Sequence, residues 1–210
     1  MQMIHKQEKV VILLNNNEKV VIPSRLYPLE STPFRILNEE NTEPVLEQTI
    51  IELFDRAASN IGQCFTNIEQ LVKNLNEAGY DAKQYVGWAF IFGDSQPIHH
   101  SVAVLDNSIL DLRVNTTQLL KDLPMGNYSL DERRQLLAQR YKLLEQLPNH
   151  QKCVIGKCCL GEMYVMAEAT KEQGQIRNRT LRTEYIDHPA FRDVRANGQT
   201  MMQSMILDNK

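Results

Sequence analysis

The chain of 210 residues is long enough for one domain with a hydrophobic core, or for a small domain with an appendage. Hydrophobic residues make up 42% and charged residues 23%, an ordinary balance that excludes a chain disordered throughout. The formal net charge of −3 gives no general attraction to nucleic acid, and no stretch is long and apolar enough to span a bilayer. We therefore expect a protein that binds neither nucleic acid nor membrane.

The amino terminus does not resemble a secretory signal. Lys6, Glu8 and Lys9 precede the short apolar run 10–14, and no small-residue cleavage site follows it. This pattern predicts a cytoplasmic protein, which would reside in the host cytosol if a phage encodes it.

The four cysteines, Cys64, Cys153, Cys158 and Cys159, are too few for a disulfide scaffold at this length and favour a reducing compartment. Cys158 and Cys159 are adjacent, so on a strand they would point to opposite faces. A zinc site built from His150, Cys153 and Cys158 is an alternative, but the chain lacks paired CxxC spacing. We expect no metal and no cofactor.

The first part of the chain, 1–42, is predicted to hold a hairpin followed by a looping segment. Two runs rich in β-branched residues, 9–14 and 19–22, predict the strands of the hairpin. Three prolines then interrupt the chain, which shows no sustained period up to about residue 42.

The second part, 43–170, is predicted to be an α+β core. Apolar residues at helical spacing predict one helix over 43–58 and another from about Cys64 to Gly79. Thr66 and Glu69 have the spacing of a capping box. Three β-like runs follow, at 85–92, 99–105 and 108–114, with Asp106 and Asn107 as the turn between the last two.

Two more helices are predicted over 116–123 and 130–147, the second capped by Ser129, and β-like pieces lie within 153–169. Helices followed by a run of adjacent strands favour the α+β class over a doubly wound parallel sheet.

The third part, 171–210, is predicted to be an appendage of the core. Its polar stretch 171–182 indicates an exposed connection, and a weak helical pattern covers 188–208.

Cys64 has the position of a reactive thiol, because it lies where the second helix is predicted to begin. Free N–H groups and the helix dipole at a helix N-terminus stabilise the thiolate, which is the reactive form. Gly62 permits a tight turn before it. The backbone N–H of Cys64, with Gln63 as a candidate side-chain donor, would form an oxyanion hole. The plain alternative is a buried cysteine without chemistry.

Asp111 lies in an otherwise apolar strand, where a carboxylate is costly unless it is paired. A two-residue turn at 106–107 would place His100 on the same face as Asp111, one strand step away. A three-residue turn would select His99 as the alternative base. Asp-Asn suits the two-residue turn, so the sequence favours His100.

These residues form a candidate catalytic triad. Cys64 is the nucleophile, His100 is the general base and acid, and Asp111 holds the imidazole in one tautomer and orientation. Asn67, one turn after Cys64, is expected to support the site or the helix and not to react.

The segments Gly62–Asn67, Tyr85–Ala89, Pro97–Val102 and Ile109–Leu112 together resemble a pattern of bacterial and phage proteins in the papain-like and transglutaminase-like superfamily. The resemblance covers about residues 59–114. It implies a fold in which the catalytic cysteine opens a helix packed on an antiparallel sheet that carries the histidine and the aspartate. Two features depart from the pattern, which often has Trp two residues after the His and Pro-Thr after the Asp; this chain has Val102 and Leu112-Arg113.

The resemblance implies a cysteine-dependent hydrolase or acyltransferase, in the range of peptidases, amidases, deamidases and transglutaminases. Such an enzyme would attack an amide, thioester or ester bond of a peptide, a protein or a small amide through an acyl-cysteine intermediate. The alternative is a non-catalytic binding or structural protein, such as a phage component, that retains the fold.

Overall fold

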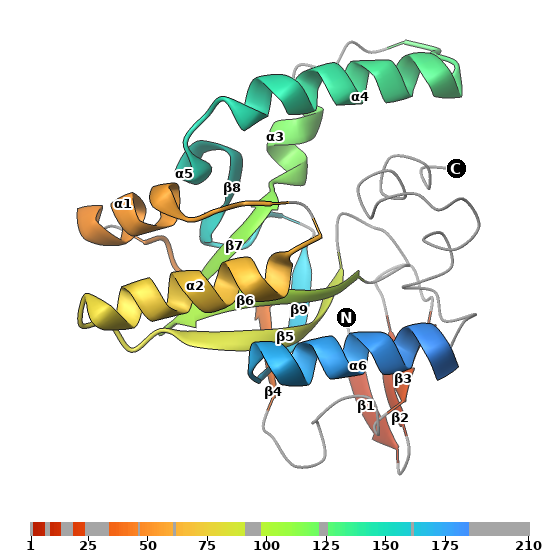
Figure 1. Ribbon diagram of the computed structural model, residues 1–210. Helices are drawn as coiled ribbons and strands as arrows, with labels where there is room; N and C mark the ends of the chain where they lie inside the picture. Colours follow the sequence, from red (N-terminus) through yellow and green to blue (C-terminus); the bar gives the residue numbers. More distant parts are fainter. Residues whose placement is uncertain are drawn as a thin grey trace.

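The computed structural model describes residues 2–6, 9–13, 19–23, 34–45, 47–60, 62–90, 98–121, 126–160 and 162–184. Within these ranges the chain forms two antiparallel sheets and six helices (Figure 1). None of the described helices has both the length and the apolar character that crossing a bilayer requires.

The smaller sheet consists of strands β1 (Gln2–Lys6), β2 (Lys9–Leu13) and β3 (Lys19–Pro23), in that order. β2 and β3 pair antiparallel, which confirms the strand pairing of the predicted hairpin. Its turn, 14–18, lies outside the described residues. β1 pairs with β2 and is not predicted by the sequence pattern.

The larger sheet consists of six strands: β4 (Phe34–Asn38), β5 (Lys83–Phe90), β6 (Ile98–Leu105), β7 (Ser108–Val114), β8 (Cys153–Gly156) and β9 (Met163–Glu168). Their order is β4-β9-β5-β6-β7-β8, and every neighbouring pair is antiparallel. The sheet is curled (Figure 1). These strands and the helices confirm the predicted α+β class.

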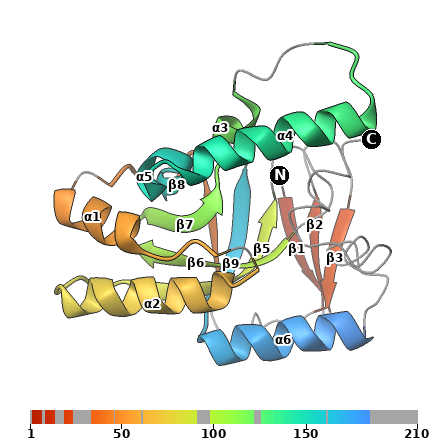
Figure 2. The ribbon, with the colours of Figure 1, turned by 45° about the horizontal axis from the view of Figure 1, so that its top comes forward.

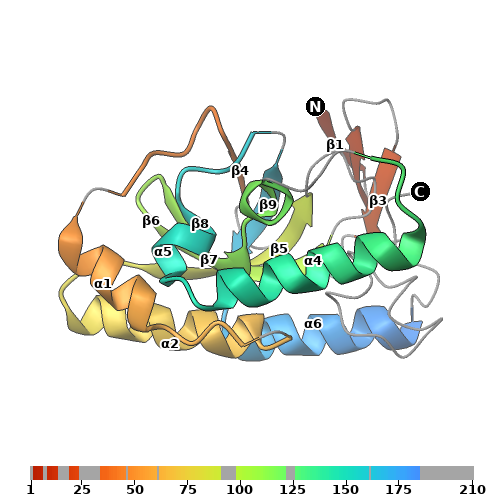
Figure 3. The same cartoon turned by 90° about the horizontal axis from the view of Figure 1, so that it is seen from above.

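The helices are α1 (Gln48–Arg56), α2 (Cys64–Glu77), α3 (Thr116–Leu120), α4 (Leu130–Glu145), α5 (Asn149–Lys152) and α6 (Lys171–Glu184). α2 begins at Cys64 as predicted, and Gly79, with a φ of 93°, follows its end. The cap at Ser129 is also confirmed, because its side chain accepts a hydrogen bond from the backbone N–H of Glu132. Figure 3 shows α2 and α6 in line along one side of the molecule.

Two predicted connections are regular structure instead. Segment 34–38, predicted as loop, is strand β4, because its backbone pairs with β9 along its whole length. Segment 171–182, predicted as an exposed connection, belongs to α6. This helix has few apolar residues and is held by tertiary contacts, since Gly174 packs against the Phe65 ring. The weak helical pattern at 188–208 lies outside the described residues.

One helix start and one predicted capping box also differ from the prediction. The first helix begins at Gln48 and not at residue 43, because the backbone of Glu43 is bonded to the β6–β7 turn, its N–H donating to the Asn107 carbonyl. The capping box of Thr66 and Glu69 does not form, and Glu69 instead pairs with Lys171 of α6 at 2.7 Å.

Hydrophobic side chains pack on both faces of the larger sheet. On one face α1 and α2 lie against β6 and β7 (Figure 2), through Ile50, Phe54, Ile68, Leu71, Leu75, Ala103, Leu105, Leu110 and Leu112. On the other face the strands pack on one another because the sheet curls, through Leu37, Tyr85, Ala89, Val102, Val104, Ile109, Val154, Tyr164 and Met166. Burial of these side chains is the main force that holds the strands of the site in place.

The turn between β6 and β7 determines which side chains meet. Asp106 has a φ of 53°, as the first residue of a primed two-residue turn requires, and Leu105 lies opposite Ser108. This register confirms the prediction. Because side chains alternate along a strand, His100 and Asp111 project from the same face.

Candidate active site

Cys64 is the first residue of α2, directly after the turn that contains Gly62, whose φ is 76°. The first bond of the helix runs from the Asn67 N–H to the Gln63 carbonyl at 2.9 Å. The N–H groups of Cys64 and of the next two residues therefore have no acceptor within the helix. The Cys64 side chain is half-buried and packs beside Phe65. A partly accessible thiol thus lies at the positive end of the helix dipole.

The turn before Cys64 is fastened to α2 by a side chain that the sequence indicates as a support. Asn67 is buried, and its Nδ2 donates a hydrogen bond to the Asn60 carbonyl at 2.9 Å. Gln63 is exposed and makes no capping bond with its side chain. Asn67 therefore supports the turn, as expected, whereas no contact of Gln63 places its amide over the thiol.

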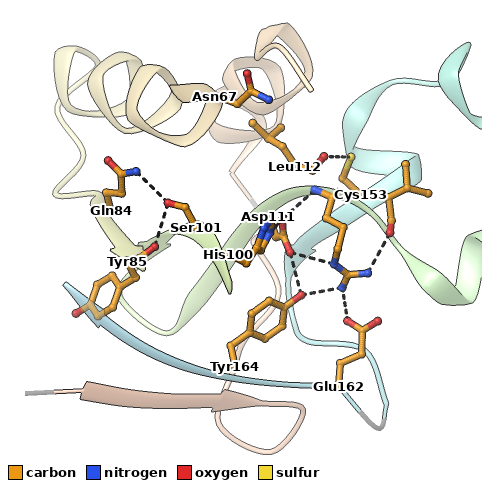
Figure 4. Close-up of polar contacts among 12 residues, drawn as sticks. Asn67, Gln84, Tyr85, His100, Ser101, Asp111, Leu112, Cys153, Glu162 and Tyr164 are labelled. Carbon is orange, nitrogen blue, oxygen red and sulfur yellow. Dashed lines mark hydrogen bonds and ion pairs between the residues drawn. The ribbon is translucent and has the colours of Figure 1, made fainter. Parts of the chain in front are cut away.

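A second fastening, which the sequence analysis missed, ties the start of α2 to the sheet. Gln84 of β5 donates from Nε2 to the Phe65 carbonyl at 3.0 Å and to Ser101 Oγ at 2.9 Å. Ser101 is fully buried and donates in turn to the Tyr85 carbonyl at 3.1 Å (Figure 4). Because Ser101 follows His100 in β6, this chain of bonds fixes the distance between the helix start and the histidine strand.

His100 and Asp111 are bonded side chain to side chain. The Nε2 of His100 lies 2.8 Å from Asp111 Oδ1, and the two side chains are only 5% and 1% exposed (Figure 4). His99, the alternative base, points to the other face and packs its ring against Trp88 and Phe65, with centroids 5.1 and 5.8 Å away. The structure thus brings His100, and not His99, to the carboxylate.

Charge interactions set the protonation states of this pair. Burial by itself lowers the pKa of His100, but the charge and hydrogen bond of Asp111 outweigh burial and raise the pKa to about 10. Burial by itself raises the pKa of Asp111, yet the His100 imidazolium and the Arg113 guanidinium outweigh burial and lower the pKa of that carboxyl to about 2. At neutral pH the pair is an imidazolium bonded to a carboxylate.

The other nitrogen of the imidazole faces away from Asp111. Nδ1 of His100 is buried and has no well-aligned hydrogen bond to any described residue. The Cys64 side chain nevertheless lies close enough to contribute, by hydrogen bonding and charge, to the raised pKa of His100. This effect on the pKa of His100 is the observation that links Cys64 to the bonded pair of His100 and Asp111.

Asp111 has further partners that the sequence analysis missed. Its Oδ1 also accepts from the Arg113 backbone N–H at 2.9 Å. Its Oδ2 accepts from the Tyr164 hydroxyl at 3.0 Å and lies 3.4 Å from the Arg113 guanidinium. The guanidinium in turn donates to Tyr164 at 2.8 Å and to Glu162 at 2.6 Å. Figure 4 shows Glu162, Tyr164, Asp111 and His100 in one connected cluster.

One signal for this cluster is present in the sequence. Arg113 lies two residues after Asp111 in a strand, so both side chains project from one face, and Glu162 and Tyr164 have the same spacing. Arg113 is also one of the three residues that depart from the resembled family pattern, with Val102 and Leu112. The sequence does not predict that β9 lies two strands away from β6 in the sheet, and this placement brings Glu162 and Tyr164 to Asp111.

The residues of the alternative zinc site do not converge. His150 Nδ1 bonds Asp55 at 2.6 Å, and the Cys153 thiol donates to the Leu112 carbonyl at 3.4 Å. In the part of the chain that the structure describes, no three His, Cys, Asp or Glu side chains are grouped so as to hold a metal ion.

The chain was compared with protein-family models, with curated proteins and with solved structures. None of the three comparisons gives a match.

Proposed function

We propose that this protein is a cysteine-dependent hydrolase or acyltransferase with a papain-like or transglutaminase-like active site. It acts on an amide, thioester or ester bond of a peptide, a protein or a small amide. One observation carries the proposal: the imidazole of His100 is bonded to buried Asp111 through Nε2 and interacts with Cys64, which opens helix α2. This is the arrangement that nucleophilic catalysis by a thiol requires.

The reaction has two steps. The Cys64 thiolate attacks the carbonyl carbon, and the oxygen that becomes negative is bound by N–H groups at the start of α2. The imidazolium of His100 gives its proton to the leaving amine, thiol or alcohol, and the acyl group stays on the sulfur. His100, now neutral, takes a proton from water or from an acceptor amine. That nucleophile attacks the thioester, and the thiolate leaves.

Two properties support a special role for Cys64 among the four cysteines. Burial raises the pKa of Cys153 and Cys158 to about 12 and that of Cys159 to about 11, so these thiols are poor nucleophiles at neutral pH. Cys64 is half-buried and adjoins an imidazolium. A thiol-selective reagent should therefore distinguish it.

The first test is alkylation by iodoacetamide at neutral pH, followed by peptide mass spectrometry. We expect Cys64 to be modified well before the other three cysteines, and His100→Gln to slow the modification of Cys64 while leaving that of the other three unchanged. Asp55→Asn is a matched control, because it removes the partner of His150 in a second His–Asp pair, which contains no triad residue. Equal labelling of all four cysteines would favour the alternative of a non-catalytic binding or structural protein.

The second test looks for the acyl intermediate. A p-nitrophenyl acetate reaction should give a burst of nitrophenolate and a protein heavier by one acetyl group on Cys64. Cys64→Ala should lose the burst while it keeps its fold by circular dichroism. Absence of both burst and acetylated Cys64 in the wild-type protein would contradict the proposal.

A further inference from the structure

Glu162 is a buried carboxylate of the site, like Asp111, but no step of the proposed reaction uses it. Its side chain is 0% exposed, and Oε2 accepts from Arg113 at 2.6 Å. A buried charge is costly, and it persists only where the surroundings compensate for it. Glu162 lies just before β9, far in sequence from His100, so only the fold brings the two together.

Among His100, Asp111, Arg113 and Glu162, which form one buried cluster, the charges balance only when His100 is protonated. Asp111 and Glu162 supply two negative charges, and Arg113 supplies one positive charge. The imidazolium supplies the fourth charge and makes the sum zero. Without Glu162, the same cluster would carry one excess positive charge in a buried place, and release of the His100 proton would remove it.

The geometry gives Glu162 a second effect. Arg113 contacts Asp111 through Nε and through its backbone N–H, and it contacts Glu162 through the far end of the guanidinium. Tyr164 fills the remaining space, accepting from Arg113 and donating to Asp111. Glu162 therefore holds the guanidinium in the orientation in which it and Tyr164 clamp the second oxygen of Asp111.

We propose that Glu162 is a positioning residue of this site, acting through Arg113 and Asp111 on the orientation and the charge of His100. The inference deepens the proposed function and, as a statement about catalysis, rests on it. The bond that joins Glu162 to the site goes to Arg113 and not to Cys64 or His100. Its influence passes through the guanidinium.

Every element around His100 contributes groups that must be considered in such a charge balance. Most of them are neutral near pH 7. Burial raises the pKa of Tyr164 well above its usual range. Burial also raises the pKa of the thiols of Cys153 and Cys158 to about 12 and that of Cys159 to about 11. Cys64 of α2 contributes to the raised pKa of His100. The charged members of the cluster are His100 of β6, Asp111 and Arg113 of β7, and Glu162 before β9. Two further charges of opposite sign, the Cys64 thiolate of the proposed reaction and Lys152 of α5 beside Cys153, leave the sum at zero.

The test is the titration of the His100 imidazole by NMR in the full chain, assigned with His100→Gln. In Glu162→Gln, which keeps the shape of the side chain, we expect the midpoint of His100 to fall by about one pH unit or more, as removal of one buried charge in contact with the cluster implies. Glu69→Gln is the control, because its partly exposed carboxylate pairs with Lys171. It should leave the midpoint unchanged.

A double variant separates charge from shape. Arg113→Met together with Glu162→Met removes both charges, so the sum is again zero with His100 protonated, and the midpoint should return toward that of the wild type. Replacement of a whole buried ion pair by apolar residues is often tolerated. If Glu162→Gln does not fold, the double variant decides. A His100 midpoint close to that of the wild type supports the inference. A midpoint lowered by about one pH unit or more, although neither charge remains, overturns it.

The outcomes separate this inference from the proposed function. An unchanged His100 midpoint in folded Glu162→Gln overturns the positioning role even if acetylation of Cys64 persists. A lowered midpoint, combined with a wild-type protein that forms no acyl-cysteine, supports the charge coupling and contradicts only the enzyme proposal. The pH profile of iodoacetamide labelling should shift in the same direction as the midpoint, which a purely structural role of Glu162 would not produce.

Discussion

His100 Nε2 and Asp111 Oδ1 are joined by a bond of 2.8 Å just beyond the point where the β6–β7 ladder ends, since the last paired residues are Ala103 and Leu110. Beyond that point, the bond between the His100 and Asp111 side chains, and not backbone pairing, joins β6 to β7. Asp111 holds the first ring nitrogen, and in the proposed reaction the second nitrogen exchanges its proton with Cys64 and the leaving group. Asp111 thus determines the orientation of the His100 imidazole.

Asp111→Asn should slow both Cys64 alkylation and any turnover at neutral pH. The amide keeps the shape of the side chain but removes the charge that raises the pKa of His100, so burial then lowers that pKa. A displaced general acid and base costs about 10²- to 10⁴-fold in rate. The loss should be smaller than for Cys64→Ala, which removes the nucleophile. Labelling rates like those of the wild type would show that Asp111 does not orient the imidazole.

The His100–Asp111 pair should make stability depend on pH in two directions. The pKa of His100 is raised from 6.5 to about 10, so its contribution is complete below 6.5 and is lost as the pH rises toward 10. The pKa of Asp111 is lowered from 3.8 to about 2, so its contribution is complete above 3.8 and is lost as the pH falls toward 2. Urea unfolding of wild type and His100→Gln should therefore show a difference in unfolding free energy that shrinks between about pH 6 and about pH 9. A constant difference would contradict the raised pKa.

The part of the site that lies close in sequence could be predicted, because local rules determine it. Helical periodicity and a preceding glycine fix the start of α2 at Cys64, and a two-residue turn fixes the parity that pairs His100 with Asp111. Each inference needs only the residues within one element or one hairpin.

The supporting contacts could not be predicted, because they depend on how distant segments meet. Tyr164 reaches Asp111 only because β9 inserts between β4 and β5, and no local pattern specifies that strand order. Helix α6 is similar, since its sequence is polar and its position depends on contacts with α2. Chain regions that are ordered by tertiary contact alone resemble connections when only their own residues are considered.

Gly156→Ala should destabilise the fold more than a matched glycine substitution elsewhere. Gly156 has a φ of 77°, and an added Cβ would lie 2.7 Å from Pro44 Cα and closer still to the backbone N of Val45. Left-handed strain and overpacking together should cost at least about 2 kcal/mol of unfolding free energy. Gly79→Ala is the control, because its φ is 93° but nothing lies within 4 Å of the new atom. Equal losses in urea unfolding would show that the contact with 44–45 relaxes freely.

Gly174→Ala should connect helix α6 to the reactivity of Cys64. Alanine favours a helix by about 1 kcal/mol over glycine, but here its Cβ would lie 2.7 and 2.8 Å from two ring carbons of Phe65. Overpacking of this kind costs about 1–3 kcal/mol, so we expect the clash to outweigh the gain in helix propensity. Phe65 follows Cys64 in the first turn of α2, and a displaced ring would move the thiol relative to His100.

The measurement for Gly174→Ala is the rate of Cys64 labelling by iodoacetamide, with urea unfolding of the same sample. Misplacement of a reacting group by about 1 Å can cost as much as about 10²-fold, so a shift of a few tenths of an ångström should slow labelling several-fold. Gln175→Ala is the matched control, because Gln175 is the next residue of α6 and is exposed. Slower labelling in Gly174→Ala alone would mean that α6 helps to set the position of the nucleophile. Unchanged labelling in a destabilised variant would instead limit the contact between Gly174 and Phe65 to packing.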